Sequence, residues 1–277
     1  MTVQNPVVEL YYPESDGQPM AETDLHRDWM VRIIDILQHR YEGEPVYISG
    51  NLFLYYHDGD PQRSVSPDAL VVKGIPADRR RIYKVWEEGK VPDVVFETTS
   101  DSTRRNDTVR KFELYARIGI REYFLYDPTA DYLNPPLQGY RLGTNGYVRI
   151  EPDTERRLTC EELDLFLELH DGALVFRDRQ TGRIQLTRAE AIAEERDRQA
   201  TARRTAEVAR RAAEAAQRSA EAAQRSADAA RLTAEAELER ELAARRAAEA
   251  NAVQMAAEIA ALRAQLAKAT PEPRAES

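Results

Sequence analysis

Two acidic residues and one lysine are the side chains in this sequence whose types and spacing best suit chemistry. Asp68 precedes the apolar run Ala69–Val72, and Glu97 ends the apolar run Val94–Phe96. Carboxylates on neighbouring strands can share a hard divalent cation such as Mg²⁺, which polarises a phosphoryl oxygen and lowers the pKa of an attacking water. A nearby lysine such as Lys111 can orient that water or neutralise developing charge. The alternative interpretation is that the two acids only mark the ends of strands.

The stretch Pro92–Pro128 contains the elements that must position Glu97. Its apolar run predicts a strand, which a Thr/Ser/Asp cluster then interrupts. Apolar residues at helical spacing predict a helix from Asp107, as the N-cap, to Ile118, and a second strand follows at Glu122–Tyr126. A crossover of this length favours parallel strands with the helix packed on the sheet. A carboxylate at the C-terminal end of such a strand lies where α/β sheets usually place their chemistry.

Further helix and strand patterns fill the rest of the first 185 residues. A helix is predicted to begin at Thr23 or Asp24, both of which are good N-cap residues. A long or bulged strand is predicted over residues 46–56, and the pair Asn145-Gly146 between two short strands predicts a β-hairpin. These patterns together predict an α/β domain over residues 1–185, with a mixed sheet flanked by helices.

Composition limits the possible functions. Residues 186–277 carry 16 basic and 16 acidic side chains, so the whole net charge of −9 falls on the first 185 residues. An acidic body argues mildly against a non-specific grip on nucleic acid, which relies on basic surface. Cys160 is the only cysteine, which excludes an intrachain disulfide and a thiolate-rich metal site. Because no apolar run approaches 18 residues and no signal pattern follows Met1, we expect a soluble, cytoplasmic chain without membrane contact.

Residues 186–268 are predicted to form an Ala-rich helical or coiled-coil tail, followed by a disordered C-terminus over 269–277. The sequence AEAAQRS occupies 213–219 and again 220–226, and seven residues is the coiled-coil period. Glu and Arg at i,i+4 positions make a long single helix the competing interpretation. The larger side chains of Val253–Leu266 favour a homodimer held mainly by that part of the coil.

Several separate stretches of this sequence resemble the Uma2 family, also called DUF820. They are GNLFLYY at 50–56, SPDALVVKG at 66–74, YKVWEEGKVPD at 83–93 and the long stretch that runs from PDVVFETTS to REYFLYDP at 92–128. The resemblance covers roughly residues 10–185. The family belongs to the PD-(D/E)XK restriction-endonuclease-like superfamily. It therefore implies a restriction-endonuclease-like core of one helix, three antiparallel strands, a helix and a strand.

The resemblance also implies roles for individual residues. Asp68 corresponds to the superfamily's first acid and Glu97 to its second. The superfamily lysine should stand two residues after the second acid, where this sequence has Thr99, so Lys111 on the following helix is interpreted as the migrated lysine. Lys73 is the other candidate for that role. Glu22 resembles the helical acid that some members add to the metal site.

The function predicted at this point is Mg²⁺- or Mn²⁺-dependent endonucleolytic cleavage of DNA. Asp68 and Glu97 would hold the metal, and Lys111 and Glu22 would complete the catalytic group. His26, one helical turn after Glu22, could face the same cleft or could be structural. The basic connection from Lys73 to Lys90 is the predicted DNA-facing edge. The alternative function is a catalytically silent nuclease-like fold that acts as a binding or scaffolding module through its coil.

A smaller basic group stands close to the predicted catalytic residues. Arg104 and Arg105 lie between Glu97 and Lys111 in the sequence, and they either contact phosphates or only solvate the loop.

Overall fold

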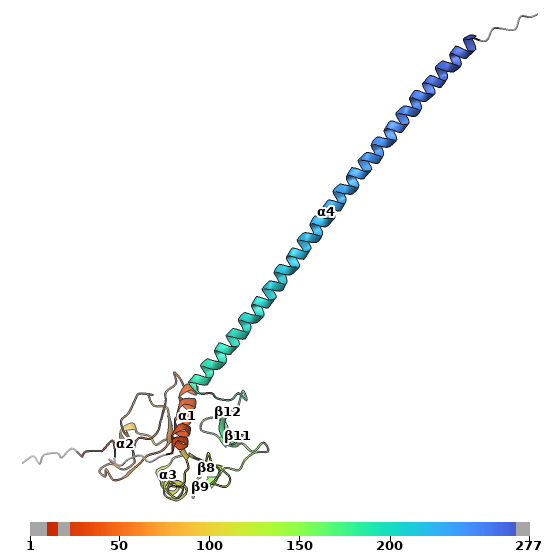
Figure 1. Ribbon diagram of the computed structural model, residues 1–277. Coiled ribbons are helices and arrows are strands. Elements are labelled where there is room, and N and C mark those ends of the chain that lie inside the picture. Colours follow the sequence, from red (N-terminus) through yellow and green to blue (C-terminus); the bar gives the residue numbers. More distant parts are fainter. Residues whose placement is uncertain (1–9, 16–22, 270–277) are drawn as a thin grey trace, which may run out of the picture. The chain divides into compact units, whose positions relative to one another are not determined.

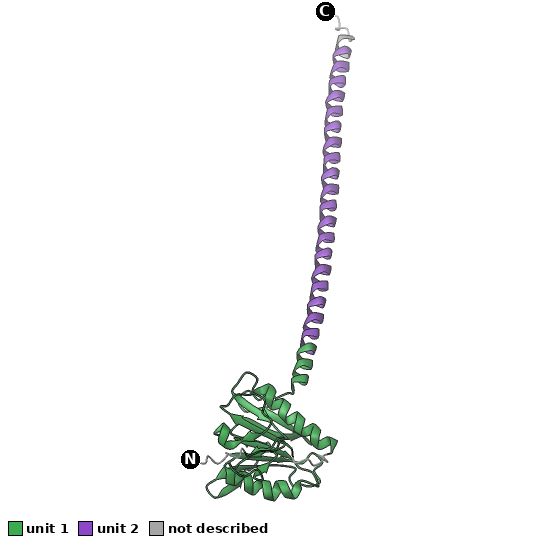
Figure 2. Cartoon of the chain, turned by 90° about the vertical axis from the view of Figure 1, so that its left-hand side faces the viewer, with its two compact units in different colours: residues 1–196 green, residues 197–277 purple. Residues whose placement is uncertain are grey.

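The computed structural model describes residues 10–15 and 23–269 of the 277-residue chain, with side chains to residue 265. Two compact units make up the chain, residues 1–196 and 197–277 (Figure 2). The C-terminal segment predicted to be disordered comprises residues 269–277. Of these, residues 270–277 lie outside the described residues. In the described part of the chain, no helix is long and apolar enough to cross a membrane.

A six-stranded mixed sheet forms the centre of the first unit. Its strand order is β1-β4-β6-β7-β8-β9, and the pair β6–β7 is parallel while the other neighbours are antiparallel. The strands are β1 (Val46–Ser49), β4 (Ala69–Lys73), β6 (Val94–Thr98), β7 (Glu122–Tyr126), β8 (Leu137–Gly143) and β9 (Gly146–Arg149). The parallel pair is the strand–helix–strand unit that the crossover length predicts. The fold is therefore mixed α/β, as the sequence pattern indicates.

Helices cover both faces of this sheet, and the alternating side chains of β6 show which helix packs on which face. Val94 and Phe96 pack in one core cluster with the apolar face of α1 (Asp24–Arg40). Val95 lies between them in the sequence and packs in a second cluster with α3 (Phe112–Ile118). Successive residues of a strand point to opposite faces, so α1 and α3 lie on opposite sides of β6 (Figure 1).

The strand predicted over residues 46–56 is interrupted, which corrects that prediction. β1 ends at Ser49, and the chain resumes as β2 (Leu54–Tyr55) in a different sheet. A Cβ added to Gly50 would lie 1.8 Å from the Asp68 carbonyl oxygen, and Asn51 has a positive φ of 51°. Only glycine allows this close backbone approach, so the chain turns away here instead of extending the strand.

Two small three-stranded sheets complete the first unit. The strands of the first are β2, β3 (Ser64–Val65) and β5 (Tyr83–Lys84), which leads into the short helix α2 (Val85–Glu88). The strands of the second are β10 (Leu158–Cys160), β11 (Leu165–His170) and β12 (Ala173–Asp178). The side chains of Leu165, Leu167 and Phe176 join the core cluster on the α1 face, so the second small sheet closes that side.

The helix after β6 begins earlier than predicted and contains a π-helical turn. Arg104 and Arg105 are already helical, and η1 (Asn106–Lys111) is a π-helix that continues into α3. The Asp107 backbone N–H donates to the Thr103 carbonyl, so Asp107 lies inside the helix and is not its N-cap. Gly119 ends α3 with a φ of 93°, a left-handed conformation that glycine adopts without strain.

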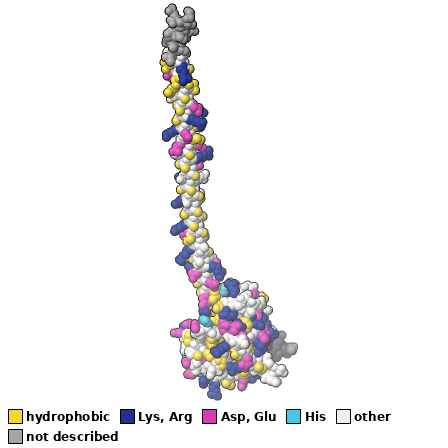
Figure 3. All heavy atoms as spheres, turned by 90° about the vertical axis from the view of Figure 1, so that its right-hand side faces the viewer, with side chains coloured by type: hydrophobic (Ala, Val, Ile, Leu, Met, Phe, Trp, Pro, Cys, Tyr) yellow, Lys and Arg dark blue, Asp and Glu magenta, His cyan; other side chains and the backbone are white. Residues whose placement is uncertain are grey.

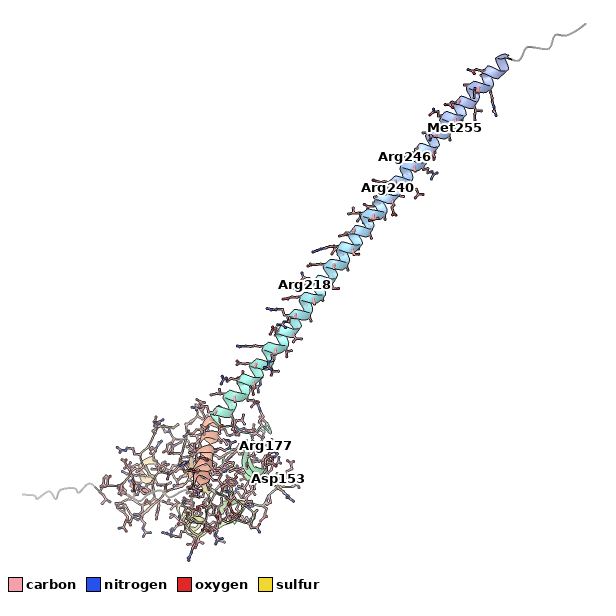
Figure 4. All side chains as sticks on the ribbon, viewed as in Figure 1. Asp153, Arg177, Arg218, Arg240, Arg246 and Met255 are labelled. Carbon is pink, nitrogen blue, oxygen red and sulfur yellow. The ribbon has the colours of Figure 1, made fainter. Side chains whose placement is uncertain are left out.

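A single helix, α4 (Arg188–Ala269), forms the tail. Thr187 and Glu190 form a capping box at its start, with Glu190 N–H donating to Thr187 Oγ1 and Thr187 N–H donating to Glu190 Oε2. From Ile192 to residue 265 every side chain is exposed, and apolar, basic and acidic groups alternate along the helix (Figure 3). Arg218, Arg240, Arg246 and Met255 project outward from it (Figure 4).

Candidate active site

The two candidate acids meet where β4 and β6 lie side by side. Ala69 pairs with Phe96 in the antiparallel ladder, which places Asp68 next to Glu97. The Asp68 backbone N–H donates to Glu97 Oε2 at 3.3 Å, and the Thr98 backbone N–H donates to Asp68 Oδ2 at 2.7 Å. Each carboxylate thus accepts a hydrogen bond from the strand that carries the other. The pairing of β4 with β6 therefore fixes the positions of both acids.

Lys111 and Tyr115 reach the same carboxylate from the helix. Lys111 Nζ donates to Glu97 Oε2 at 2.7 Å, and Tyr115 Oη donates to Glu97 Oε1 at 2.6 Å. The Glu97 side chain is fully buried, and that of Lys111 is 10% exposed. The structure therefore brings Asp68, Glu97 and Lys111 together, and it adds Tyr115, which the sequence analysis did not name.

Burial and charge set the ionisation of this group. Burial raises the pKa of Glu97 well above its usual range, and the positive charge of Lys111 opposes that shift. Burial alone would lower the pKa of Lys111, but the carboxylates of Glu97, Asp107 and Asp68 outweigh it and raise that pKa. Lys111 is therefore a cation throughout the physiological pH range.

His26 joins the group from the opposite side of the sheet. Its Nε2 lies 3.1 Å from Asp68 Oδ2, and its side chain is 3% exposed. The N-cap Thr23 accepts a hydrogen bond from the His26 backbone N–H and so fixes the first turn of α1. A pocket of about 200 Å³ opens beside His26, and its other lining residues are Thr23, Leu25, Thr99, Ser100, Asp101, Ser102, Pro128, Thr129 and Tyr132. Of the two alternatives for His26, the structure therefore favours a place at the candidate site.

Asp107 is a site residue that the sequence analysis missed. Its side chain is 1% exposed, and its Oδ1 lies 3.4 Å from Lys111 Nζ. Among the described residues neither carboxylate oxygen accepts a well-aligned hydrogen bond, and its polar neighbours are Thr103 and Lys111. Asp107, Lys111 and Tyr115 recur every four residues, and polar side chains at that helical spacing are the signal that could have identified Asp107.

Glu22 and Lys73 are the two further candidates named from the sequence. Glu22 lies outside the described residues. Lys73 Nζ donates to the carbonyl of Glu162 at 2.6 Å, away from Glu97, so Lys111 is the lysine that the structure brings to the acids.

The donors at this site fit a hard divalent cation. Three buried carboxylates, those of Asp68, Glu97 and Asp107, stand against the single ammonium of Lys111 and the imidazole of His26. Mg²⁺ keeps several waters and needs only one or two protein carboxylates. Over residues 10–15 and 23–269, no three His, Cys, Asp or Glu side chains are grouped closely enough to hold a metal among themselves. A metal here would rely on two carboxylates and on water.

The predicted DNA-facing edge is largely neutralised by acidic partners. Lys84 pairs with Glu87 at 2.8 Å and Lys90 with Asp93 at 2.9 Å, and Arg80 and Arg81 pair with Glu88 and Glu14. This pairing argues against the connection from Lys73 to Lys90 as the main nucleic-acid contact.

Three arginines near Lys111 are free of such partners. Arg104, Arg105 and Arg110 are exposed and form no ion pair with any side chain in the described part of the chain. Arg104 and Arg105 directly precede the π-helical turn that carries Lys111, and Arg110 lies within it, so the unpaired basic charge lies close to Lys111 in the chain.

Asp127, after the end of β7, organises one wall of the pocket. Its Oδ1 accepts hydrogen bonds from Thr129 N–H, Thr129 Oγ1 and Ala130 N–H, and its Oδ2 accepts from Tyr132 N–H and Leu133 N–H. Burial alone would raise the pKa of Asp127, but these hydrogen bonds outweigh it and lower that pKa.

Asp127→Asn is expected to destabilise the first unit by about 2 kcal/mol at pH 7, because an amide group cannot accept the hydrogen bonds that one of the carboxylate oxygens now accepts. The native pKa is depressed, so the ionised carboxylate stabilises the fold above its ordinary pKa of about 4 and loses that contribution as the pH falls through the native value. The gap between wild type and variant should therefore narrow between pH 5 and about pH 2. Chemical denaturation at several pH values measures this gap, and a gap independent of pH would contradict the assignment.

The first unit is a mixed α/β domain with a six-stranded mixed sheet and a buried acid–lysine group, and a long helix forms the C-terminal part of the chain. The chain belongs to the Uma2 family, whose model, described as "Putative restriction endonuclease", matches residues 4–167. This match confirms the family resemblance noted in the sequence.

Comparison with solved structures gives a match to the crystal structure of "a putative nuclease belonging to DUF820" from Anabaena variabilis ATCC 29413. The sequence identity is 16% and the TM-score is 0.39, over 52% of this chain and 76% of that chain. No curated protein matches this sequence.

Proposed function

We propose that residues 1–185 form an endonuclease domain that hydrolyses DNA phosphodiester bonds with Mg²⁺ or Mn²⁺. The observation that carries this proposal is the convergence of Asp68, Glu97 and Lys111 at the end of two paired strands. Asp68 and Glu97 would hold the metal. Glu22, although outside the described residues, remains the proposed auxiliary carboxylate.

When bound, the metal would polarise the phosphoryl oxygen and lower the pKa of the attacking water. Lys111 stays protonated, so it donates hydrogen bonds to the water or to the negative charge that develops on the phosphate, and it does not act as a proton acceptor. His26 and the Thr98 backbone N–H hold Oδ2 of Asp68. Tyr115 holds Oε1 of Glu97, so the carboxylates are oriented before substrate arrives.

Arg104, Arg105 and Arg110 are the proposed contacts to the DNA backbone. They are exposed, and the side chains of the described residues do not neutralise them, in contrast to the connection from Lys73 to Lys90. Guanidinium groups bind phosphate bidentately and contribute affinity without reading sequence. Of the two alternatives for Arg104 and Arg105, this favours phosphate contact.

The test of this function is cleavage of supercoiled plasmid DNA by the purified full-length chain. Nicked or linear product should form with Mg²⁺ or Mn²⁺, and excess chelator should stop the reaction. Absence of product with either metal, over a range of pH and salt and with single-stranded DNA as well, would refute the nuclease proposal.

The second candidate function is a silent nuclease-like fold that works as a scaffolding module through α4. The observation that favours it is the apolar row Met255, Ile259 and Leu262, whose side chains are 61%, 48% and 64% exposed. These residues step by four and three along one helix face, which suits a coiled-coil seam. The Ala-rich section before them buries little area per heptad, so this row should contribute most of the association. The proposed partner is a second copy of the chain.

Full-length protein is expected to be dimeric at micromolar concentration, and protein truncated after Leu186 is expected to be monomeric. Ile259→Asp should convert the full-length dimer to a monomer, because it places a charge in the proposed seam. Ala261→Asp is the matched control, since residue 261 lies on the opposite face of the helix. Light scattering gives the masses, and a monomeric wild type would exclude the homodimer.

The same truncation separates the two candidate functions. A truncated protein that still cuts DNA would locate the chemistry entirely in the first unit. If neither form cuts while the dimer persists, the scaffolding function is the one supported.

A further inference from the structure

The ammonium group of Lys111 lies between two buried acids. Its Nζ is 2.7 Å from Glu97 Oε2 and 3.4 Å from Asp107 Oδ1. Both acids are almost inaccessible to solvent, at 1% exposure each. The two carboxylates therefore share one cation, which lies closer to Glu97, and neither carboxylate is accessible to water.

Both oxygens of Glu97 are already in use in this arrangement. Oε2 accepts hydrogen bonds from Lys111 Nζ and the Asp68 backbone N–H, while Oε1 accepts one from Tyr115 Oη. A divalent cation held by Glu97 would stand close to the Lys111 ammonium, and two like charges in a buried site repel strongly. Lys111 thus competes with any metal for this carboxylate.

The Asp107 carboxylate differs from that of Glu97, because it is buried but can accept further hydrogen bonds. Among the described residues its only ion-pair partner is Lys111, and the Thr103 side chain is its other polar neighbour. Its position is firmly held, since its backbone N–H donates to the Thr103 carbonyl and its own carbonyl accepts from Tyr123 Oη at 3.0 Å. A carboxylate can accept about four hydrogen bonds, so Asp107 can accept a shorter contact from the Lys111 ammonium.

Two simpler explanations for Asp107 do not match its surroundings. It is not an N-cap, because it lies within a helix that begins at Arg104. It is also not grouped with Asp68 and Glu97 as a third metal ligand, since the described residues contain no such set of three. The π-helical turn, a feature that often occurs at functional sites, places both Asp107 and Lys111 on the inner face of the helix.

We propose that Lys111 has two positions, and that Asp107 is the positioning residue that receives its ammonium group when Glu97 binds a divalent cation. The inference rests on the proposed metal-dependent function. In the first position the ammonium caps Glu97 and keeps the buried carboxylate paired. In the second position it is held by Asp107, stays protonated and remains close enough to contact the water or the phosphate. Asp107 thus acts through Lys111 and touches neither metal nor substrate.

The experiment is a double-mutant cycle on Mn²⁺ affinity, measured by calorimetry on the full-length chain without DNA. Asp107→Asn should weaken Mn²⁺ binding by roughly 10- to 100-fold, a typical effect of losing an outer partner of a metal site. In the Lys111→Met background the same substitution should have little effect, because no ammonium has to be received. Lys111→Met alone should bind Mn²⁺ at least as tightly as wild type.

Glu113→Gln is the matched control, because it removes one acidic charge from an exposed position on α3, the helix that follows Lys111. It should leave Mn²⁺ affinity close to that of wild type. If Asp107→Asn weakens binding equally with and without Lys111, Asp107 attracts the metal only through its charge, and the two-position proposal is overturned. If neither wild type nor Lys111→Met binds Mn²⁺, both the two-position proposal and the metal-dependent function are overturned.

A crystal structure with Mn²⁺ tests the same proposal without any variant that could fail to fold. Lys111 Nζ should lie within hydrogen-bond distance of Asp107 and farther from Glu97 than in the metal-free protein. Lys111 that stays on Glu97 while Mn²⁺ is bound would overturn the inference and leave the nuclease function intact. The reverse result, a shifted lysine in a protein that cuts no DNA, would separate the metal switch from catalysis.

Discussion

Asp68→Asn and Glu97→Gln are each expected to reduce metal-dependent DNA cleavage by about a thousandfold or more. Both carboxylates lie at the junction of β4 and β6, and each is the proposed holder of the metal. Loss of a metal that polarises the phosphate and activates water removes several kcal/mol of transition-state stabilisation, and each 1.4 kcal/mol is about tenfold in rate. The side chains keep their size in both substitutions, so the effect should be on chemistry.

Rates of plasmid nicking under single-turnover conditions measure this effect, and circular dichroism shows whether each variant folds. Glu97→Gln should fold, because Lys111 retains Asp107 as an ion-pair partner. Glu113→Gln removes an exposed acid from α3, outside the pocket beside His26, and should cut at the wild-type rate. Cleavage that survives either active-site substitution would point to a contaminating nuclease and support the scaffolding function.

Lys111→Met is expected to lower the cleavage rate by about a hundredfold while Mn²⁺ binding is retained. The carboxylates around Lys111 raise its pKa, so the side chain supplies a permanent positive charge. Removing one group that stabilises developing charge in a buried site typically costs about 10² to 10³ in rate. The combination of slow chemistry and intact metal binding distinguishes Lys111 from Asp68 and Glu97, whose variants should lose both.

The pH profile of cleavage separates a permanently protonated Lys111 from a lysine that acts as a proton acceptor. Because Lys111 is already protonated at neutral pH, cleavage by wild type should show no loss from its deprotonation up to pH 9. A lysine that served as the proton acceptor would instead make the rate rise as it loses its proton. Retained wild-type cleavage in folded Lys111→Met would rule out the migrated-lysine assignment.

Local patterns predicted the elements that carry the site. Thr23 was one of the two predicted N-caps of α1, and its Oγ1 accepts a hydrogen bond from the His26 backbone N–H. The apolar run before Glu97 predicted β6, and α3 ends at Ile118 as predicted. Each of these features depends on residues within a few positions of one another, so alternation, helical spacing and capping are enough to identify them.

The side-chain partners depended on the tertiary structure. Asp107 has the residue type of an N-cap, but a π-helical turn carries it into the core beside Lys111. The strand predicted over residues 46–56 ends after β1 because the backbone of Gly50 lies against that of Asp68. This contact joins residues eighteen positions apart. Part of the charge of the basic connection from Lys73 to Lys90 is neutralised by acids of distant segments, since Arg81 pairs with Glu14 and Lys73 with Glu162.

The sequence by itself determined the family and the order of most elements, and it named Asp68 and Glu97 as the candidate acids, because these features are recorded in residue types at short spacing. Only the tertiary structure decided which of Lys73 and Lys111 reaches Glu97, and that His26, Asp107 and Tyr115 surround the same group. The physical reason is that burial and strand pairing are properties of the assembled sheet. A carboxylate becomes a buried, charge-sharing group only when β4, β6, α1 and α3 close around it.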